Sequence, residues 1–119
     1  MKQNIDSVLN EIKNRLIPDG IEKLVLFGSY ASGIPSEDSD IDLLVVTADQ
    51  EMPKSFSDKA KIYLRIARKL EDIRRRIPVD LIVHTHPMYE KFQEMDSMFS
   101  REIKEKGRVL YEKDYASVV

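Results

Sequence analysis

The chain has 119 residues, of which 42% are hydrophobic and 34% are charged, and its formal net charge is −2. This length fits one domain over residues 1–119, and the near balance of charge argues against strong nucleic-acid binding. The absence of cysteine excludes disulfides, thiolate zinc sites and cysteine nucleophiles. No apolar run approaches the roughly 20 residues of a membrane span, and the charged N-terminal segment does not resemble a signal peptide. We therefore expect a small, soluble, cytoplasmic domain.

The first part of the chain predicts one helix and two strands. Residues 21–27 are continuously apolar toward their end, as in a strand that is covered on both faces. Small residues follow at 28–33 and suit a turn that opens a short helix. After a polar loop, residues 40–47 predict a second strand. Before all of these, apolar residues at helical spacing predict a helix that ends at Pro18: Ile5, Leu9, Ile12 and Leu16.

The second part of the chain predicts two further helices and two further strands. An apolar stripe runs through residues 57–76 and predicts one long helix that Pro78 ends. Residues 79–83 predict a short strand, residues 87–106 a last helical region, and residues 108–111 a final strand. The alternation of helices and strands indicates an α/β layer structure.

A candidate phosphate site lies where the first predicted strand ends. Gly28 has no Cβ, so a phosphate can approach the main chain there, and Ser29 can add a hydroxyl donor. Backbone donors in such a turn point at one place and favour an anion. A Gly-Ser pair alone is more often an ordinary strand-to-helix turn.

Three aspartates form a candidate metal site. Side chains alternate along a strand, so Asp40 and Asp42 share a face and lie about 7 Å apart. Asp80 stands at the head of the next strand, where an unpaired charge among apolar neighbours is costly to bury. Solvated strand ends would explain each feature separately. If the two strands are neighbours, however, the three carboxylates cluster and suit divalent cations and two-metal phosphoryl transfer.

These motifs together resemble a known superfamily. Gly28-Ser29, Ser39-Asp40-Ile41-Asp42-Leu43 and Val79-Asp80-Leu81 resemble, in this order, the Gly-Ser…Asp-x-Asp…Asp signature of the DNA polymerase β-like nucleotidyltransferases. The short length and the Gly-Ser-x-Ala-x-Gly form of residues 28–33 resemble the minimal nucleotidyltransferases (MNT), usually antitoxins of HEPN/MNT toxin–antitoxin pairs. The resemblance implies the α/β (α+β) nucleotidyltransferase fold, with a mixed sheet of about four strands packed against helices.

The resemblance also implies a role for each motif residue. Gly28 and Ser29 would hold the β- and γ-phosphates of ATP. Asp40 and Asp42 would bind two Mg²⁺ ions, and Asp80 would bind one of them and help to deprotonate the attacking hydroxyl. AMP would then pass from ATP to a hydroxyl, and the family implies a tyrosine of a HEPN ribonuclease toxin as acceptor.

One departure from the family pattern keeps other functions open. Ser32 stands where the common form has arginine, and serine supplies neither the charge nor the fork of a guanidinium. A binding module that neutralises the toxin by contact alone is therefore an alternative, as is an aminoglycoside-type enzyme, although such enzymes usually carry a further domain. The sequence leaves the nucleotide base, the acceptor atom and the oligomeric state open.

Three other groups of residues favour structural interpretations. His84 and His86 fit imidazoles at a strand end better than a zinc site, because no third ligand lies nearby. The segment 74–76 is a run of arginines that fits a solvated helix face better than a nucleotide-steering patch. A stripe in the last helical region predicts core more than a partner interface or a homodimer seam: Tyr89, Phe92, Met95, Met98, Phe99 and Ile103.

Overall fold

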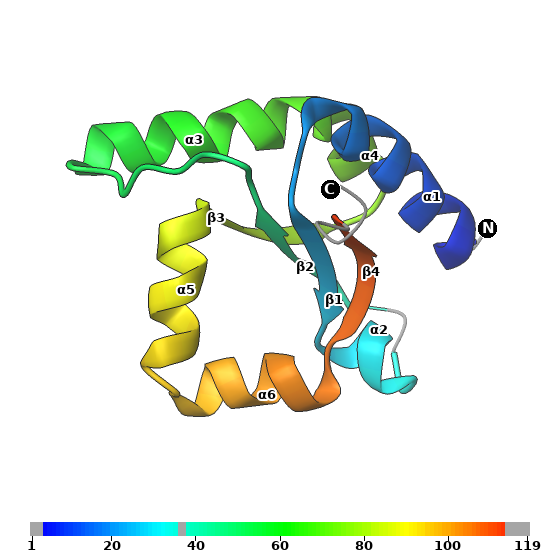
Figure 1. Ribbon diagram of the computed structural model, residues 1–119. Helices are drawn as coiled ribbons and strands as arrows, with labels where there is room; N and C mark the ends of the chain where they lie inside the picture. Colours follow the sequence, from blue (N-terminus) through cyan, green and yellow to red (C-terminus); the bar gives the residue numbers. More distant parts are fainter. Residues whose placement is uncertain (1–3, 36–37, 114–119) are drawn as a thin grey trace.

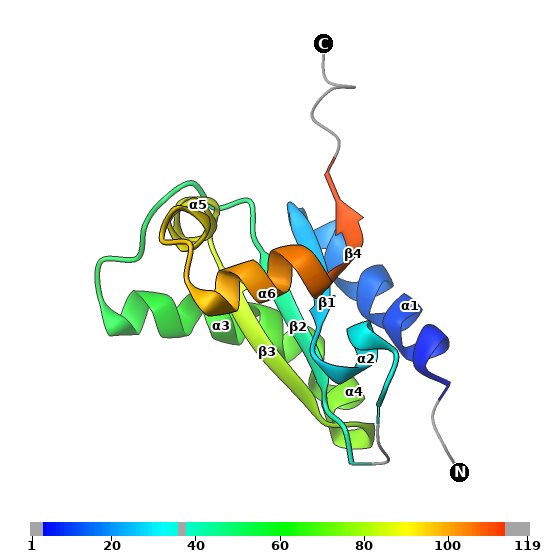
Figure 2. The ribbon, with the colours of Figure 1, turned by 90° about the horizontal axis from the view of Figure 1, so that it is seen from below.

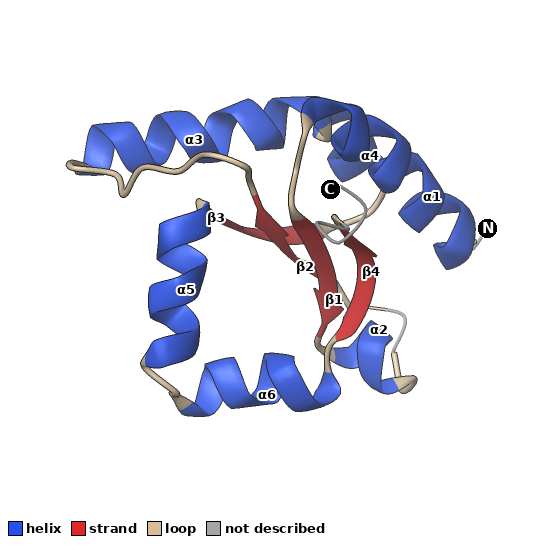
Figure 3. Cartoon of the chain, viewed as in Figure 1, coloured by secondary structure: helices blue, strands red, loops and turns tan. Residues whose placement is uncertain are grey.

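The computed structural model describes residues 4–35 and 38–113. At its centre is a mixed four-stranded sheet with the strand order β3-β2-β1-β4 (Figure 3). β1 pairs antiparallel with both β2 and β4, whereas β2 and β3 run parallel. This confirms the predicted α/β (α+β) class and the sheet of about four strands. The strands are β1 (Lys23–Phe27), β2 (Ile41–Val46), β3 (Val79–His84) and β4 (Arg108–Glu112).

Helices cover both faces of the sheet (Figures 1 and 2). The larger core packs α1, α3 and α4 against one face, and the smaller core packs α5 and α6 against the other. None of the helices in residues 4–35 and 38–113 has the length and apolarity needed to cross a membrane. The helical elements are α1 (Ile5–Leu16), η1 (Ile17–Asp19), α2 (Ser29–Ser32), α3 (Phe56–Lys69), α4 (Glu71–Arg76), α5 (His86–Glu94) and α6 (Met98–Lys106).

The first strand shows why its sequence is continuously apolar. Leu24 and Leu26 belong to the larger core, and Val25 between them belongs to the smaller core on the opposite face. All three are almost fully buried. Because successive side chains point to opposite faces, a strand with two covered faces needs no polar alternation.

Two helices predicted as continuous are interrupted. The predicted helix 57–76 breaks at Leu70, whose backbone leaves helical geometry at φ −108° and ψ 8°. Leu70 and Ile73 are three residues apart, and both are fully buried. The apolar stripe therefore continues through the break, and the spacing of apolar residues gives no sign of it. The predicted helix 87–106 is interrupted before Met98. Asp96 adopts φ 46° there, and its carboxylate accepts two hydrogen bonds from Arg101, at 2.9 and 2.8 Å.

A substitution at the buried break between α3 and α4 tests the assignment of the core. Replacing Leu70 by alanine leaves a cavity in a fully buried site, so we expect the free energy of unfolding to fall by about 2–5 kcal/mol. Leu64 lies on α3 and is 44% exposed, so Leu64→Ala is the matched control and should change stability by less than about 0.5 kcal/mol. Urea unfolding at equilibrium measures both. Equal losses in the two variants would contradict this assignment of the core.

Candidate active site

The end of β1 and the beginnings of β2 and β3 meet at one edge of the sheet. In the antiparallel pair, Asp42 lies opposite Phe27, the last residue of β1 before Gly28. In the parallel pair, Asp42 lies opposite Asp80. The structure therefore brings together Gly28, Asp42 and Asp80, which are far apart in the sequence. We call this the catalytic edge.

The two aspartates project from the face of the sheet that carries α5 and α6. Asp42 has the same parity along β2 as Leu44 and Val46, which lie in the smaller core. Asp80 has the same parity along β3 as Ile82, which packs against that core. Because side chains alternate, both carboxylates stand on this face, one beside the other.

The backbone at the catalytic edge is fixed by its neighbours. The N–H of Ile41 donates to the carbonyl of Pro78 at 3.0 Å, which ties the entrances of β2 and β3 together. Asp40 immediately precedes Ile41 and is half-buried. In the turn after β1, the carbonyl of Gly28 accepts from the N–H groups of Ala31 and Ser32, at 3.2 and 3.1 Å. These bonds close the short helix α2, which begins at Ser29.

Gly28 is required by sterics as well as by conformation. Its φ of 74° and ψ of −155° lie in a region that is essentially restricted to glycine. A Cβ at this position would lie 3.0 Å from Cγ of Asp42 and would overlap its Oδ2 atom. The main chain of Gly28 is thus in direct contact with the Asp42 carboxylate, and any side chain would displace that carboxylate.

The carboxylate of Asp42 interacts with those of Asp80 and Asp40. Partial burial raises the pKa of Asp42, and the charge and hydrogen bond of Asp80 and the charge of Asp40 raise this pKa further. Ionised together, these groups repel, and a divalent cation would relieve the repulsion.

The donor set suits Mg²⁺ shared with a nucleotide. Among residues 4–35 and 38–113, no three His, Asp or Glu side chains converge closely enough to hold a metal ion alone. Mg²⁺ usually takes one or two carboxylates, and waters and substrate phosphates complete its octahedron. The neighbouring oxygens of Asp42 and Asp80 therefore fit a metal that is also bound by a triphosphate. Asp40 lies close enough for its charge to act on Asp42.

Ser32 does not replace the missing arginine. Its hydroxyl donates to the carbonyl of Ser29 at 2.9 Å, within the same short helix. Ser32 is exposed and brings no positive charge to the catalytic edge.

The other groups singled out in the sequence lie outside the catalytic edge. His84 ends β3, at the opposite end of the strand from Asp80, and its Nδ1 is buried without a hydrogen-bond partner in the described structure. His86 forms ion pairs with Glu22, at 2.7 Å, and with Glu90. These contacts favour structural imidazoles over a zinc pair.

The arginine run on α4 forms ion pairs. Arg75 bonds Glu71 at 3.2 Å, and Arg76 bonds Glu11 at 2.9 Å. These contacts favour the solvated helix face that the sequence indicated.

The unpartnered imidazole predicts a pH dependence of stability. Burial lowers the pKa of His84 to about 4, from an ordinary value of 6.5, and the charge of Lys59 adds to this effect. The unfolded chain then takes up this proton at higher pH than the folded chain. His84 therefore lowers the free energy of unfolding as the pH falls from 6.5 toward 4.

We expect His84→Phe, which keeps a ring against Tyr89 and Phe92, to flatten this acid-side slope in urea unfolding. His86→Gln is the control, because hydrogen bonding to Glu22 raises the pKa of His86. The stabilisation of the folded state by protonated His86 is fully present below pH 6.5 and is lost as the pH rises through the folded-state pKa of His86. His86→Gln should therefore keep the acid-side slope of the wild-type protein. An unchanged slope in His84→Phe would contradict the assignment.

Comparison with known proteins places the chain in a family. Residues 10–116 match the family described as Polymerase beta, Nucleotidyltransferase. The chain therefore belongs to this family and is a nucleotidyltransferase. This confirms the family that the Gly-Ser and aspartate motifs indicated.

Relatives in Methanocaldococcus jannaschii agree with this assignment. The chain is 29% identical over 111 residues to MJ0604, provisionally named a protein adenylyltransferase, and the match covers 93% of this chain and 94% of MJ0604. It is 37% identical over 83 residues to MJ1379, which bears the same provisional name, with 66% and 76% covered.

Solved structures share the fold. The crystal structure of a protein from Sulfolobus solfataricus, provisionally named a nucleotidyltransferase, matches with a TM-score of 0.52 and 22% identity, over 96% of this chain and 93% of that chain. A toxin–antitoxin crystal structure with AMP-PNP matches with a TM-score of 0.53 and 21% identity, over 92% and 77%. The nucleotidyltransferase fold implied by the motifs is thus confirmed.

Proposed function

We propose that this protein is an antitoxin that transfers AMP from ATP to a hydroxyl of a partner toxin, a tyrosine of a HEPN ribonuclease, in a Mg²⁺-dependent reaction. The observation that carries the proposal is the contact of Asp42 with Asp80 on one side and with the main chain of Gly28 on the other. A carboxylate pair that would hold a metal and a backbone that a phosphate would approach thus meet at one edge.

Each residue of the catalytic edge has a role in this reaction. Asp42 and Asp80 would hold Mg²⁺, with Asp40 adding negative charge, and Gly28 and Ser29 would bind the β- and γ-phosphates. Bound Mg²⁺ supplies positive charge against the attacking and leaving oxygens. Asp80 would accept the proton of the attacking hydroxyl. The bond from that oxygen to the α-phosphorus forms as the bond to pyrophosphate breaks, and pyrophosphate leaves.

A protein acceptor is supported by an exposed apolar surface beside the catalytic edge. The sequence predicted that the stripe of the last helical region is core. That is correct for buried Ile103, but wrong for Met95 and Met98, which are 69% and 88% exposed at the corner between α5 and α6. A methionine side chain is flexible enough to adapt to a partner surface. The ring of Phe99 lies 5.5 Å from that of Phe27, which directly precedes Gly28.

Two groups of similar proteins favour a toxin as the acceptor. The relatives in M. jannaschii bear the provisional name of protein adenylyltransferases. Toxin–antitoxin crystal structures occur among the fold neighbours, one of them with AMP-PNP.

The direct test is label transfer. The protein is incubated with its partner toxin, Mg²⁺ and ATP labelled at the α-phosphate, and we expect label on the toxin together with loss of its ribonuclease activity. ATP labelled at the γ-phosphate is the control and should leave no label. Absence of α-label on the toxin, while the toxin is still neutralised, would overturn the enzymatic proposal.

The same assay distinguishes transfer of AMP from the main alternative, which is neutralisation of the toxin by contact alone. Ser32, which lacks the charge of arginine, favours a protein that neutralises the toxin by contact alone. In that case the double variant Asp40→Ala/Asp42→Ala would neutralise the toxin as fully as the wild-type protein. If transfer is the mechanism, this variant leaves the ribonuclease active.

A further inference from the structure

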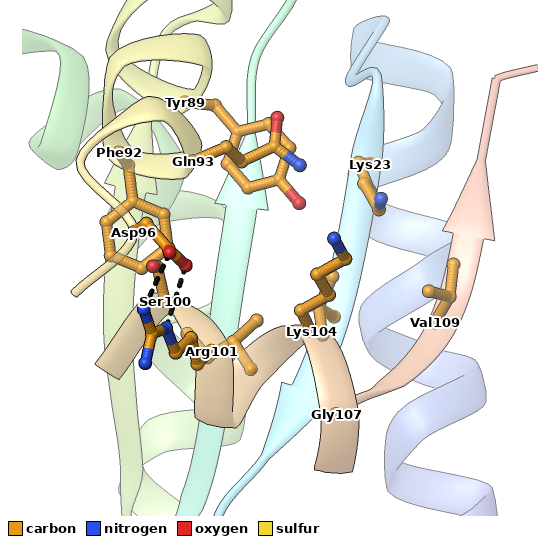
Figure 4. A pocket seen from close by; sticks show the side chains of 12 residues that line it. Lys23, Tyr89, Phe92, Gln93, Asp96, Ser100, Arg101, Lys104, Gly107 and Val109 are labelled. Atoms are coloured by element: carbon orange, nitrogen blue, oxygen red, sulfur yellow. Dashed lines mark hydrogen bonds and ion pairs between the residues drawn. The ribbon is translucent and has the colours of Figure 1, made fainter. Parts of the chain in front are cut away.

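A cavity lies on the same face of the sheet as the catalytic edge, toward the other end of β1. It has a volume of about 270 Å³ and lies between α5, α6 and the strands β1 and β4 (Figure 4). Lys23 lines one end of it and is four residues before Phe27, so its Cα is roughly 13 Å from that of Phe27, and Val25, which also lines the cavity, is nearer. We call it the lysine pocket.

Two ammonium groups converge in the lysine pocket. Lys23 from β1 and Lys104 from α6 point toward one another across the space (Figure 4). The side chain of Lys23 is only 21% exposed, and its ion pair with Glu112 is long, at 3.9 Å. Its Nζ atom also lies 5.4 Å from the centroid of the Tyr89 ring. Within the described structure, Lys104 forms no ion pair.

Among the lining residues that the structure describes, Asp96 is the one carboxylate, and it already pairs with an arginine. Asp96 accepts two hydrogen bonds from Arg101, at 2.9 and 2.8 Å, which balances the charge of that arginine. The charge of Lys104 also helps to lower the pKa of Asp96, although the two side chains do not form an ion pair. The pocket therefore keeps an excess of positive charge from Lys104, to which Lys23 adds because its ion pair with Glu112 is long, and an anion would neutralise this charge.

The remaining walls suit a flat apolar group. The rings of Tyr89 and Phe92 stand on the α5 side, with their planes 26° apart and their centroids separated by 6.3 Å. Val25 and Ile103, both buried, and Val109 supply aliphatic surface. Aromatic and aliphatic walls with a few polar groups are typical of small-molecule sites.

We propose that the lysine pocket binds a small aromatic anion, with its phosphate or carboxylate group between Lys23 and Lys104 and its ring against Tyr89 and Phe92. A nucleoside monophosphate and an aromatic carboxylate share this chemistry. Lys23 and Tyr89 place this site toward the end of β1 away from Gly28, and the proposal does not depend on the proposed transfer reaction.

The test uses ¹⁵N-labelled full-length protein in EDTA, which removes divalent metal from the catalytic edge. The protein is titrated separately with AMP and with phenylacetate, and chemical shifts are followed by NMR. We expect saturable shifts at the amides of Ser100 and Gly107, which line the pocket, for at least one of the two probes. AMP binding alone identifies a phosphate ligand, and phenylacetate binding alone identifies a carboxylate ligand. Adenosine and inorganic phosphate, each with half of the required chemistry, should bind at least tenfold more weakly than AMP.

Matched charge variants make the test specific. Lys104→Gln and Lys23→Gln should each raise the Kd at least fivefold. Lys106→Gln removes the same charge from the same helix outside the pocket and should leave the Kd unchanged. Thermal unfolding checks that each variant folds, and Lys104 is exposed enough to be replaced safely. Shifts confined to Gly28 and Ser29, no saturable shifts with either probe, or an unchanged Kd in Lys104→Gln would overturn the proposal.

Discussion

An Asp42→Asn variant is expected to transfer AMP about 10³-fold more slowly than the wild-type protein, a loss of about 4 kcal/mol of transition-state stabilisation. The amide is nearly isosteric with the carboxylate, so the contacts of Asp42 with Gly28 and Asp80 keep their shape. The negative charge that would hold Mg²⁺ between the protein and the triphosphate is lost. Initial rates of α-label transfer to the toxin at saturating ATP measure the effect.

The control for charge alone is Asp58→Asn on α3, which belongs to the opposite face of the sheet and should transfer AMP at the wild-type rate. A thermal melt in EDTA separates chemistry from misfolding. Because burial and Asp80 raise the pKa of Asp42, its ionised form destabilises the folded state as the pH rises. Asp42→Asn should therefore melt at a higher temperature than the wild-type protein at pH 7. Transfer at an undiminished rate by Asp42→Asn would exclude this carboxylate from the reaction.

A Gly28→Ala variant is expected to lose both activity and stability. The backbone conformation of Gly28 costs a non-glycine residue about 1–3 kcal/mol, and the added methyl group would overlap the Asp42 carboxylate. Relief of this overlap must move either the turn or the metal-binding side chain. We therefore expect a lower melting temperature and a loss of label transfer greater than the fraction unfolded explains.

Gly20→Ala is the matched control for backbone strain. Gly20 also has a positive φ, of 83°, but a Cβ there would meet nothing within 4 Å. It lies before β1, at the opposite end of the strand from Gly28. Gly20→Ala should lower the melting temperature and leave the transfer rate of the folded protein unchanged. Equal activity in the two variants would show that contact between Gly28 and Asp42 is unimportant for catalysis.

Local sequence patterns predicted the elements that carry the catalytic edge. The apolar run before Gly28 predicted a strand with two covered faces, and the alternation of Asp40 and Asp42 placed them on one side of the next strand. The adjacency of Asp42 and Asp80 did not follow from spacing, because nothing local specifies which strands pair. The family resemblance supplied that pairing, and the parallel register of β2 and β3 agrees with it.

Features that depend on tertiary packing could not be read from the sequence. The break at Leu70 preserves the apolar stripe, so the spacing of apolar residues does not reveal it. The start of α6, by contrast, has a local signal. Ser97 caps this helix by accepting from the N–H of Ser100, at 3.1 Å, and a search for capping serines would have found it. The lysine pocket joins Lys23 to Lys104 across most of the chain, and no local signal connects them.

The exposure of Gly28 has a consequence for the proposed reaction. This residue is open to solvent, whereas α5 and α6 pack against the part of the sheet behind it. A triphosphate seated there would keep one flank in contact with bulk water, which weakens electrostatic catalysis and lets water compete as the nucleophile. We expect the bound toxin to cover this open side and to exclude water from the reaction centre, so that turnover begins only in the complex.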